Sequence, residues 1–156
     1  MQDFSEYVNN LKRKINISKE KTVFICIGSK EIIWDSIGPY VGDFLKKIIG
    51  ERYVIGDLKN NICCEKDLIN YYPKLKNKFI VAIDSALTGR ELQGQIFITK
   101  KPIVMGLGIN KNKGVIGDIG IKASIEKGEK DRDYIIEISK NIAQGIYYCY
   151  HGTSVK

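Results

Sequence analysis

Two short runs of consecutive apolar residues stand out in the first half of the chain. Residues 22–27 (TVFICI) and 79–83 (FIVAI) carry an apolar or β-branched residue at every position. A strand with one face in water alternates apolar and polar residues, whereas an unbroken run of this length is typical of a strand buried on both faces. Both runs therefore predict central strands of a parallel sheet that helices cover.

Three other segments repeat apolar residues at steps of three and four, as an amphipathic helix does. The pattern predicts helices over residues 4–15, 39–49 and 133–150. Pro39 suits the first turn of its helix, where its missing N–H leaves no partner unsatisfied, and Gly50 is a suitable stop. The apolar stripe of the last helix consists of Ile135, Ile138, Ile142 and Ile146.

Shorter patterns fill the rest of the chain. We expect a weaker helix over residues 65–75, broken near Pro73, and a glycine-rich loop over much of residues 106–120. Short strands are expected at residues 53–55, 95–99, 103–105 and 119–125. Because strands alternate with helices, the sequence predicts an α/β fold, a three-layer α/β/α sandwich in which a mostly parallel central sheet lies between helices.

Length and composition narrow the class of protein. The 156 residues fit one domain, which we take as residues 1–156. Hydrophobic residues make up 44% of the chain, and no apolar run reaches the about 18 residues that a membrane-spanning helix needs. Residues 1–17 lack the apolar core of a signal peptide. We therefore expect a cytoplasmic protein that does not bind membranes and whose thiols are reduced.

Charge and cysteines change this picture little. Lys and Arg number 25 against 18 Asp and Glu, a formal net charge of +7, but the lysines are scattered and no basic block is interleaved with aromatic residues. Nucleic-acid binding is therefore not expected. Cys63 and Cys64 are adjacent, which fits neither a CxxC redox motif nor the spacing of zinc ligands. We expect no cofactor and no metal site, and we leave self-association into a homo-oligomer open.

Two aspartates follow the two apolar runs. Asp84 comes directly after residues 79–83, and Asp35 lies in the loop between residues 22–27 and the helix that begins near Pro39. In open α/β sheets, ligands bind outside the carboxyl ends of the strands. If the two strands are neighbours, as right-handed crossovers allow, both carboxylates face one crevice.

The surroundings expected for these two acids differ. A helix N-terminus favours the ionised form of Asp35, and burial favours the neutral form of Asp84. Such a pair can activate a water molecule and protonate a leaving group, as peptide hydrolysis requires. The alternative is structural: an Asp before a helix is often only a cap, and an Asp that closes a strand is often a turn residue.

Four other polar residues near these motifs have two interpretations each. Ser36 and Ser85 adjoin the aspartates and could orient a carboxylate, but no histidine near them in sequence makes a triad. Asp118 is either a third acid in the crevice or, as we expect, a turn residue. Arg90 either binds a substrate carbonyl or carboxylate or, by default, is a solvated loop arginine.

Three motifs resemble those of the YyaC-like sporulation protein family of spore proteases. They are residues 34–42 (WDSIGPYVG), 82–87 (AIDSAL) and 114–119 (GVIGDI), and the resemblance extends over roughly residues 20–150. The most specific feature is Asp-Ser-Ile-Gly-Pro after a strand, paired with Ile-Asp-Ser-Ala at a later strand. The family is similar in fold to the germination protease that degrades small acid-soluble spore proteins, and to hydrogenase maturation peptidases.

The resemblance implies a phosphorylase/hydrolase-like fold and a pair of catalytic aspartates. The germination protease has a matching Asp-Ala-Leu-Gly-Pro and Val-Asp-Ala-Leu, whose aspartates fall on Asp35 and Asp84 of this chain. In hydrogenase maturation peptidases, acidic residues at these two places bind nickel together with a histidine. The only histidine here is His151, at the end of the last predicted helix, and Trp34 stands where YyaC-like sequences tend to carry glycine.

The function that the resemblance implies is a sporulation-associated, aspartate-dependent peptidase. Its substrate would be a protein or peptide, with small acid-soluble spore proteins as one candidate, and it would work in the cytoplasm of the sporulating cell. The chain is much shorter than the germination protease and lacks the segments that would enclose a protein substrate. The alternative is therefore a non-catalytic regulatory or binding protein of sporulation that retains the peptidase fold.

Overall fold

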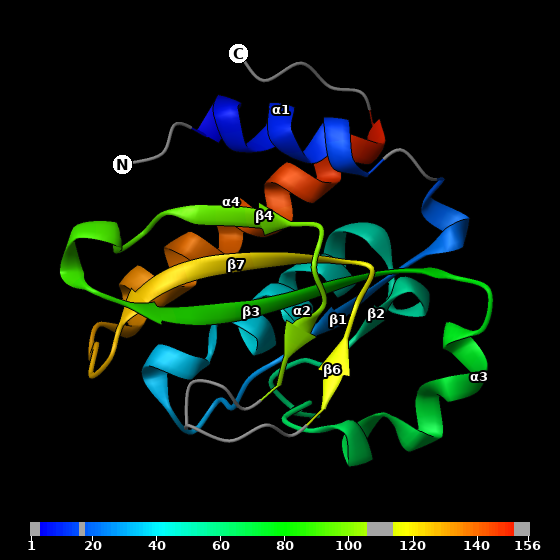
Figure 1. The fold of residues 1–156 in the computed structure, drawn as a ribbon, viewed down its shortest axis with the longest axis horizontal. Coiled ribbons are helices and arrows are strands. Elements are labelled where there is room, and N and C mark those ends of the chain that lie inside the picture. Colours follow the sequence, from blue (N-terminus) through cyan, green and yellow to red (C-terminus); the bar gives the residue numbers. More distant parts are fainter. Residues whose placement is uncertain (1–3, 16–17, 106–113, 152–156) are drawn as a thin grey trace.

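A five-stranded sheet in the order β2-β1-β3-β7-β4 forms the centre of the molecule (Figure 1). The computed structural model describes residues 4–15, 18–105 and 114–151. β2, β1, β3 and β7 run parallel, and only β4, at one edge, is antiparallel to its neighbour. The strands are β1 (Thr22–Cys26), β2 (Val54–Ile55), β3 (Phe79–Thr88), β4 (Ile96–Thr99) and β7 (Ile119–Glu126). The two apolar runs form β1 and β3, and these strands are parallel neighbours, which is the condition under which Asp35 and Asp84 were expected to face one crevice.

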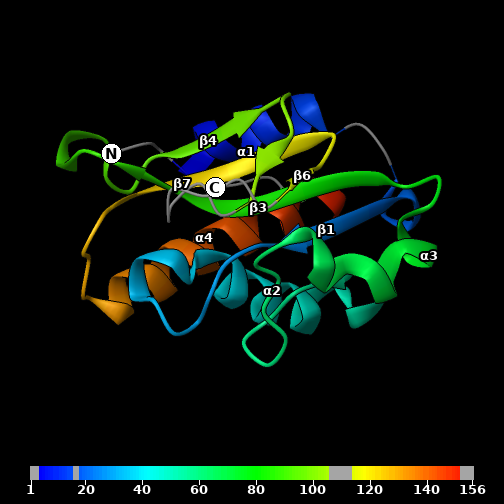
Figure 2. The same ribbon diagram turned by 60° about the horizontal axis from the view of Figure 1, so that its bottom comes forward.

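Three helices build the larger of two hydrophobic cores. They are α1 (Phe4–Lys14), α2 (Ile37–Ile49) and α4 (Arg132–His151), close to the three segments predicted from periodicity. Figure 2 shows α2 and α4 side by side along the sheet, while α1 packs against α4 and the edge strand β4. The isoleucine stripe of α4 is buried against the strands, which explains why this element was readable from spacing alone.

A thinner layer covers the opposite face. It consists of the 3₁₀-helix η4 (Glu65–Tyr71), the single turn α3 (Tyr72–Leu75) and a small two-stranded sheet of β5 (Ile103–Val104) and β6 (Val115–Ile116). Its buried residues form a second core with the other side of β1 and β3. The predicted helix over residues 65–75 is therefore mostly 3₁₀, and Pro73 lies in the first turn of α3. Helices on both faces of a mostly parallel sheet confirm the three-layer α/β/α class.

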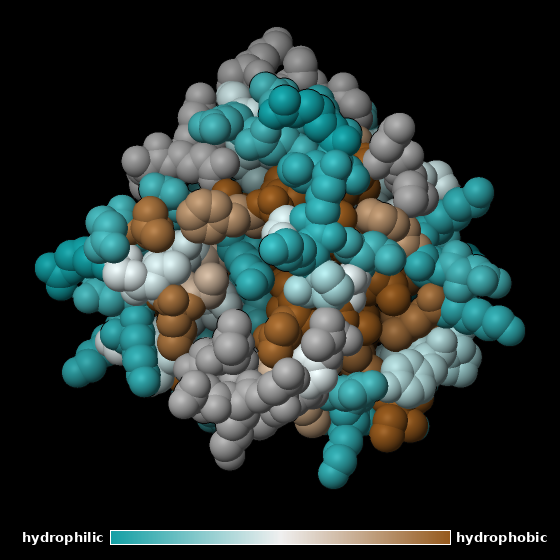
Figure 3. All heavy atoms as spheres, viewed as in Figure 1, coloured by the Kyte–Doolittle hydropathy of each residue, from teal (hydrophilic) through white to brown (hydrophobic). Residues whose placement is uncertain are grey.

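Short 3₁₀ turns link the main elements: η1 (Lys19–Lys21), η2 (Ile33–Asp35), η3 (Glu51–Tyr53) and η5 (Arg90–Leu92). Within the glycine-rich stretch predicted as a loop, residues 106–113 lie outside the described residues, while β6 and the first residues of β7 occupy part of the remainder. None of the described helices is long and apolar enough to cross a bilayer. Hydrophilic side chains surround the face seen in Figure 3, which agrees with charge that is scattered along the chain.

Helix α2 approaches the sheet so closely that two of its positions have no room for a side chain. A Cβ atom on Gly38 would lie 2.0 Å from the carbonyl oxygen of Ile27, and one on Gly42 would lie 1.9 Å from that of Gly56. The two glycines are four residues apart and therefore share one face of the helix. The helix begins at Ile37, so its first turn is held directly against the end of β1.

Strand β3 is longer than the sequence predicts, and this correction decides where Asp84 lies. The expected end was Asp84, because Asp and Ser are rare inside buried strands. Instead β3 continues to Thr88, and it pairs with β7 along most of its length, from Val81 to Thr88. Its pairing with β1 stops at Ile83. Asp84 is thus in the middle of its own strand but just beyond the carboxyl end of the neighbouring one.

Candidate active site

Asp84 is the first residue of β3 beyond the end of its pairing with β1, and we call this place the step. The last contact between the two strands is the hydrogen bond from the Ile27 N–H to the Ile83 carbonyl, 2.7 Å long. The side chain of Asp84 points to the face covered by η4, β5 and β6, because Val81 and Ile83 belong to the opposite core and strand residues alternate. Only 8% of the residue is exposed.

Asp35 is brought to the same step by the loop that follows β1. It is the last residue of η2, which lies against β3. The Ser29 N–H donates to the backbone oxygen of Asp35 (3.0 Å) and to its carboxylate Oδ2 (3.2 Å), which fixes the loop and the side chain together. Gly28 makes this possible: its φ is +145°, and a Cβ there would lie 2.2 Å from the Asp35 oxygen.

The two carboxylates interact electrostatically. Burial is the largest effect on Asp84 and raises its pKa, and the negative charge of Asp35 raises it further. The Ser85 N–H, 2.8 Å from Oδ1, and the charge of Lys122 lower it, but the pKa of Asp84 still lies well above its ordinary value. The structure thus places the two sequence-predicted acids within electrostatic reach of each other, and burial favours the neutral form of Asp84.

Lys122 is the residue of this site that sequence reasoning missed. It is the register partner of Asp84 on β7, so their side chains leave the sheet on the same face. The one signal in the sequence was a charged residue inside an otherwise apolar strand pattern, residues 119–125. A Lys within a buried strand needs a partner or a route to water.

A cavity of about 150 Å³ lies directly beside this pair. Asp84 and Lys122 form its polar part, and the second half of β3 together with β5 forms the remainder. The other lining residues are Ser85, Ala86, Leu87, Ile103 and Val104. The cavity therefore combines a buried carboxyl group and a lysine with mainly apolar walls.

The serine hydroxyls do not orient the aspartates in the way that the sequence allowed. Ser36 is buried and donates its hydroxyl to the Ile33 carbonyl (2.7 Å), closing the turn of η2. Ser85 contacts Asp84 through its backbone N–H. Asp118 lies away from the crevice, where its carboxylate accepts the Ile80 N–H (2.7 Å) and its own N–H donates to the Ile80 carbonyl. The structure therefore gives Asp118 the expected turn role.

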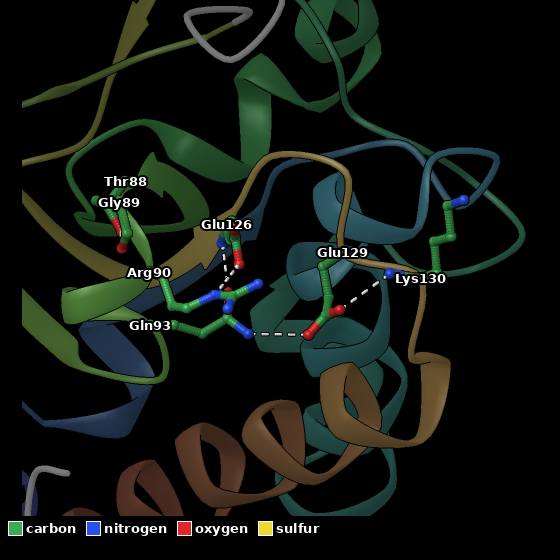
Figure 4. Close-up of polar contacts among 7 residues, drawn as sticks. All are labelled: Thr88, Gly89, Arg90, Gln93, Glu126, Glu129 and Lys130. Carbon is green, nitrogen blue, oxygen red and sulfur yellow. Dashed lines mark hydrogen bonds and ion pairs between the residues drawn. The ribbon is translucent and has the colours of Figure 1, made fainter.

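Arg90 also lies outside the cavity. Its guanidinium is 3.3 Å from the Glu126 carboxylate, at a surface where Gln93 bonds both to Glu129 and to the backbone N–H of Glu126 (Figure 4). The side chain of Arg90 is 86% exposed. It is a solvated loop arginine, as expected by default.

We expect Arg90→Ala to change the free energy of unfolding by less than about 0.5 kcal/mol, because an ion pair this exposed is screened by water. The measurement is urea unfolding of the wild type and the variant at the same ionic strength. A loss above about 1.5 kcal/mol would show that the contacts in Figure 4 act as a structural clamp.

The residues around the two aspartates do not fit the nickel site of the hydrogenase maturation peptidases. His151 is exposed at the end of α4 with its ring against Tyr147 (centroids 4.2 Å apart), and its neighbour Tyr150 packs on Phe24 in β1. Phe24 and Tyr150 belong to the core on the face of the sheet opposite to the one that the Asp84 side chain faces. No group of three or more His, Cys, Asp or Glu side chains among the described residues could hold a metal ion. A neutral acid beside a lysine is also a poor ligand set.

Comparison with known proteins agrees with the fold and with the motifs. Residues 1–146 match the model of the DUF1256 family, described as a protein of unknown function. The Uncharacterized protein YyaC of Bacillus subtilis (strain 168) is 35% identical over 107 residues, which cover 66% of this chain and 52% of YyaC. This chain thus spans about half the length of that curated relative. The resemblance to YyaC-like proteins is confirmed.

A solved structure shares the architecture. The crystal structure of HycI, a NiFe hydrogenase maturation protease from Thermococcus kodakarensis KOD1, matches with a TM-score of 0.62 at 17% sequence identity. The match covers 91% of this chain and 99% of HycI. The two proteins therefore have the same phosphorylase/hydrolase-like fold.

Proposed function

Because the chain belongs to the DUF1256 family and has the fold of a protease, we propose that it is a peptidase that hydrolyses peptide bonds with Asp35 and Asp84. One observation carries the proposal: Asp84, buried and with a raised pKa, lies within the electrostatic reach of Asp35, and the two come from different elements that meet at the end of β1. Two acids whose surroundings push their pKa values apart can serve as the general base and the general acid of a hydrolysis.

The chemistry follows from these states. The Asp35 carboxylate takes a proton from a water molecule as the water oxygen bonds to the scissile carbonyl carbon. The Asp84 carboxyl gives its proton to the leaving nitrogen, and the C–N bond breaks. The products are a new carboxyl group and an amine. Proton exchange with solvent then removes the proton that Asp35 gained and restores the one that Asp84 gave. The Ser29 N–H donates to Oδ2 of Asp35 and restrains this carboxylate in one orientation.

The biological setting is inferred from relatives. HycI is a protease by its description, and the motifs around Asp35 and Asp84 resemble those of YyaC-like sporulation proteins and the germination protease. These likenesses support a protein or peptide substrate, with small acid-soluble spore proteins as the first candidate, and a role in the cytoplasm of the sporulating cell.

The test is cleavage of purified small acid-soluble spore proteins, followed by mass spectrometry of the products. We expect Asp35→Asn to lower the rate by about 10²–10⁴-fold, because an amide cannot accept the proton of the attacking water. Asp133→Asn, an exposed aspartate in the first turn of α4, is the matched control and keeps full activity. Wild-type rates in Asp35→Asn, with an unchanged circular dichroism spectrum, would refute the proposal.

A second function is favoured by the size of the cavity. At about 150 Å³ it is smaller than the roughly 300–1,000 Å³ of typical ligand pockets, which favours a regulatory or binding protein that retains the peptidase fold without turnover. The same preparation distinguishes the two functions. A spore protein that binds the wild type in calorimetry, is released by Asp84→Asn, and is never cleaved would support the binding function over the enzyme.

A further inference from the structure

We infer that the cavity beside Asp84 binds the free α-carboxylate of a peptide's last residue, so that the protein removes single residues from a carboxyl terminus. The inference rests on the proposed peptidase function and adds a substrate class to it. It starts from a cation, Lys122, placed in a small, mostly apolar cavity that the hydrolytic step itself does not require.

Lys122 is positioned as an anion-binding group. It lines the cavity next to Asp84 and forms no ion pair within 4.0 Å among the residues that the structure describes. Its neighbours along β7 on the opposite face, Ile121 and Ala123, are fully buried, so the strand fixes the direction in which the side chain leaves the sheet. A carboxylate is the group that a half-buried, unpaired ammonium binds best.

The dimensions favour a single residue. A cavity of about 150 Å³ is the size that holds one benzene-sized group. Its walls, formed by Ala86, Leu87, Ile103 and Val104, are apolar and suit the side chain of one aliphatic residue. A longer stretch of peptide beyond the cleaved bond would need more room on this side of Asp84.

The position of Lys122 beside Asp84 suits an α-carboxylate next to the cleaved bond. Asp84 and Lys122 are register partners on adjacent parallel strands, whose backbones lie about 4.8 Å apart. In the last residue of a peptide, the carboxylate carbon lies about 2.5 Å from the scissile nitrogen, with only the Cα between them. With the nitrogen at Asp84, we expect this carboxylate to lie within reach of the Lys122 side chain, which lines the same cavity. The carboxylate of a glutamate side chain lies two carbons farther from its backbone.

Ser124 provides a second, independent observation. Its hydroxyl is fully buried, yet it has no hydrogen-bond partner among the described residues. Ser124 is on the same face of β7 as Lys122 and pairs with Ala86, which lines the cavity. Buried polar groups normally have a partner. Ser124 does not line the cavity as it stands, but a turn of its side chain toward Lys122 would let it donate to a second carboxylate oxygen bound there.

The first experiment compares three peptides that share a sequence. One ends in leucine with a free carboxylate, one has the same leucine as an amide, and one is amidated with an internal glutamate. We expect mass spectrometry to show loss of the terminal leucine from the free acid, with kcat/KM at least about 10-fold above that for the amide. Equal rates for the free acid and the amide would overturn the inference while leaving the peptidase function intact.

The second experiment assigns the preference to Lys122. In Lys122→Met, which retains the length of the side chain but not the charge, we expect the ratio of kcat/KM for acid over amide to fall to about one, and Lys122→Arg to restore it. Lys127→Met, at an exposed lysine that follows β7, leaves the ratio unchanged. If Lys122→Met instead lowers cleavage only of the peptide with internal glutamate, the cavity selects acidic side chains and the inference is wrong.

A binding measurement covers the case in which no peptide is cleaved. That result would refute the proposed function, but Asp35→Asn retains Lys122 and the cavity. We then expect the free acid to bind Asp35→Asn at least about 10-fold more tightly than the amide in calorimetry, and Lys122→Met to abolish the difference. Equal affinity for the two peptides would overturn the inference on its own.

Discussion

Asp84→Asn is expected to lower kcat/KM for peptide hydrolysis by about 10²–10⁴-fold and, at the same time, to make the protein more stable at neutral pH. The loss of activity follows because an amide has no acidic proton to give to the leaving nitrogen. The gain in stability follows because at neutral pH the unfolded chain ionises Asp84 freely in water, whereas burial in the folded protein disfavours the charged form. An amide has no charged form, so this difference disappears. Substitution of a residue that serves only packing would not lower activity and raise stability together.

The sign of the pH dependence comes from the raised pKa of Asp84, which is due first to burial and then to Asp35. Between the ordinary pKa of an aspartate, about 3.9, and the higher folded value, the folded protein holds a proton that the unfolded chain has lost. Stability of the wild type therefore falls as the pH rises through this window. Asp84→Asn lacks this fall, so the two proteins are expected to differ least near pH 4 and most near pH 8.

The measurement is the melting temperature of both proteins from pH 4 to pH 8. We expect Asp84→Asn to melt higher at pH 8 by at least about 2 °C, the shift that roughly 1 kcal/mol gives in a chain of this length. Asp35→Asn should reduce the slope only in part, because burial of Asp84 remains. Parallel curves for Asp84→Asn and the wild type would mean that Asp84 is ionised in the folded protein.

Gly38→Ala and Gly42→Ala are expected to be the most destabilising single substitutions near the site, each costing about 3 kcal/mol or more. Their added methyl groups would lie 2.0 and 1.9 Å from the carbonyl oxygens of Ile27 and Gly56, and these are backbone atoms that cannot rotate away. Elsewhere in a helix, Gly→Ala stabilises by about 0.5–1 kcal/mol. A lower free energy of unfolding would therefore show that the clash with the sheet outweighs the gain in helix propensity.

Thermal or urea unfolding measures this effect, with Lys47→Ala on the exposed side of α2 as the control for helix propensity. A loss of about 3 kcal/mol corresponds to a fall in melting temperature of roughly 6–12 °C. Because Gly38 packs on Ile27 at the end of β1, we also expect its substitution to disturb the loop that holds Asp35. A neutral or stabilising Gly38→Ala would mean that α2 can move away from the sheet without loss.

The sequence was most informative where burial leaves a repeated pattern. The apolar runs of β1 and β3 and the isoleucine stripe of α4 were readable because each contacts a core along its whole length. The end of β3 was not readable. Asp84 and Ser85 look like a strand end, but pairing with β7 continues to Thr88, and such pairing depends on a segment distant in sequence.

The candidate site was predicted in part for the same reason. Position after a strand pointed to Asp35 and Asp84, and family motifs strengthened both. Lys122 and the cavity depend on register between β3 and β7, which no local pattern contains. Conversely, Asp118 and Arg90 had plausible alternatives that only their contacts with Ile80 and Glu126 could decide.

The pairing of β7 with β3 also determines when the site comes into existence. Asp35, Asp84 and Lys122 lie on three segments that are far apart in the chain. Lys122 is a residue of β7 and reaches the site only when that strand pairs with β3. A nascent polypeptide that has not yet extended past residue 126 cannot form the full pairing between β3 and β7. Hydrolysis of the kind proposed above therefore requires that the residues of β7 have been synthesised and have paired with β3.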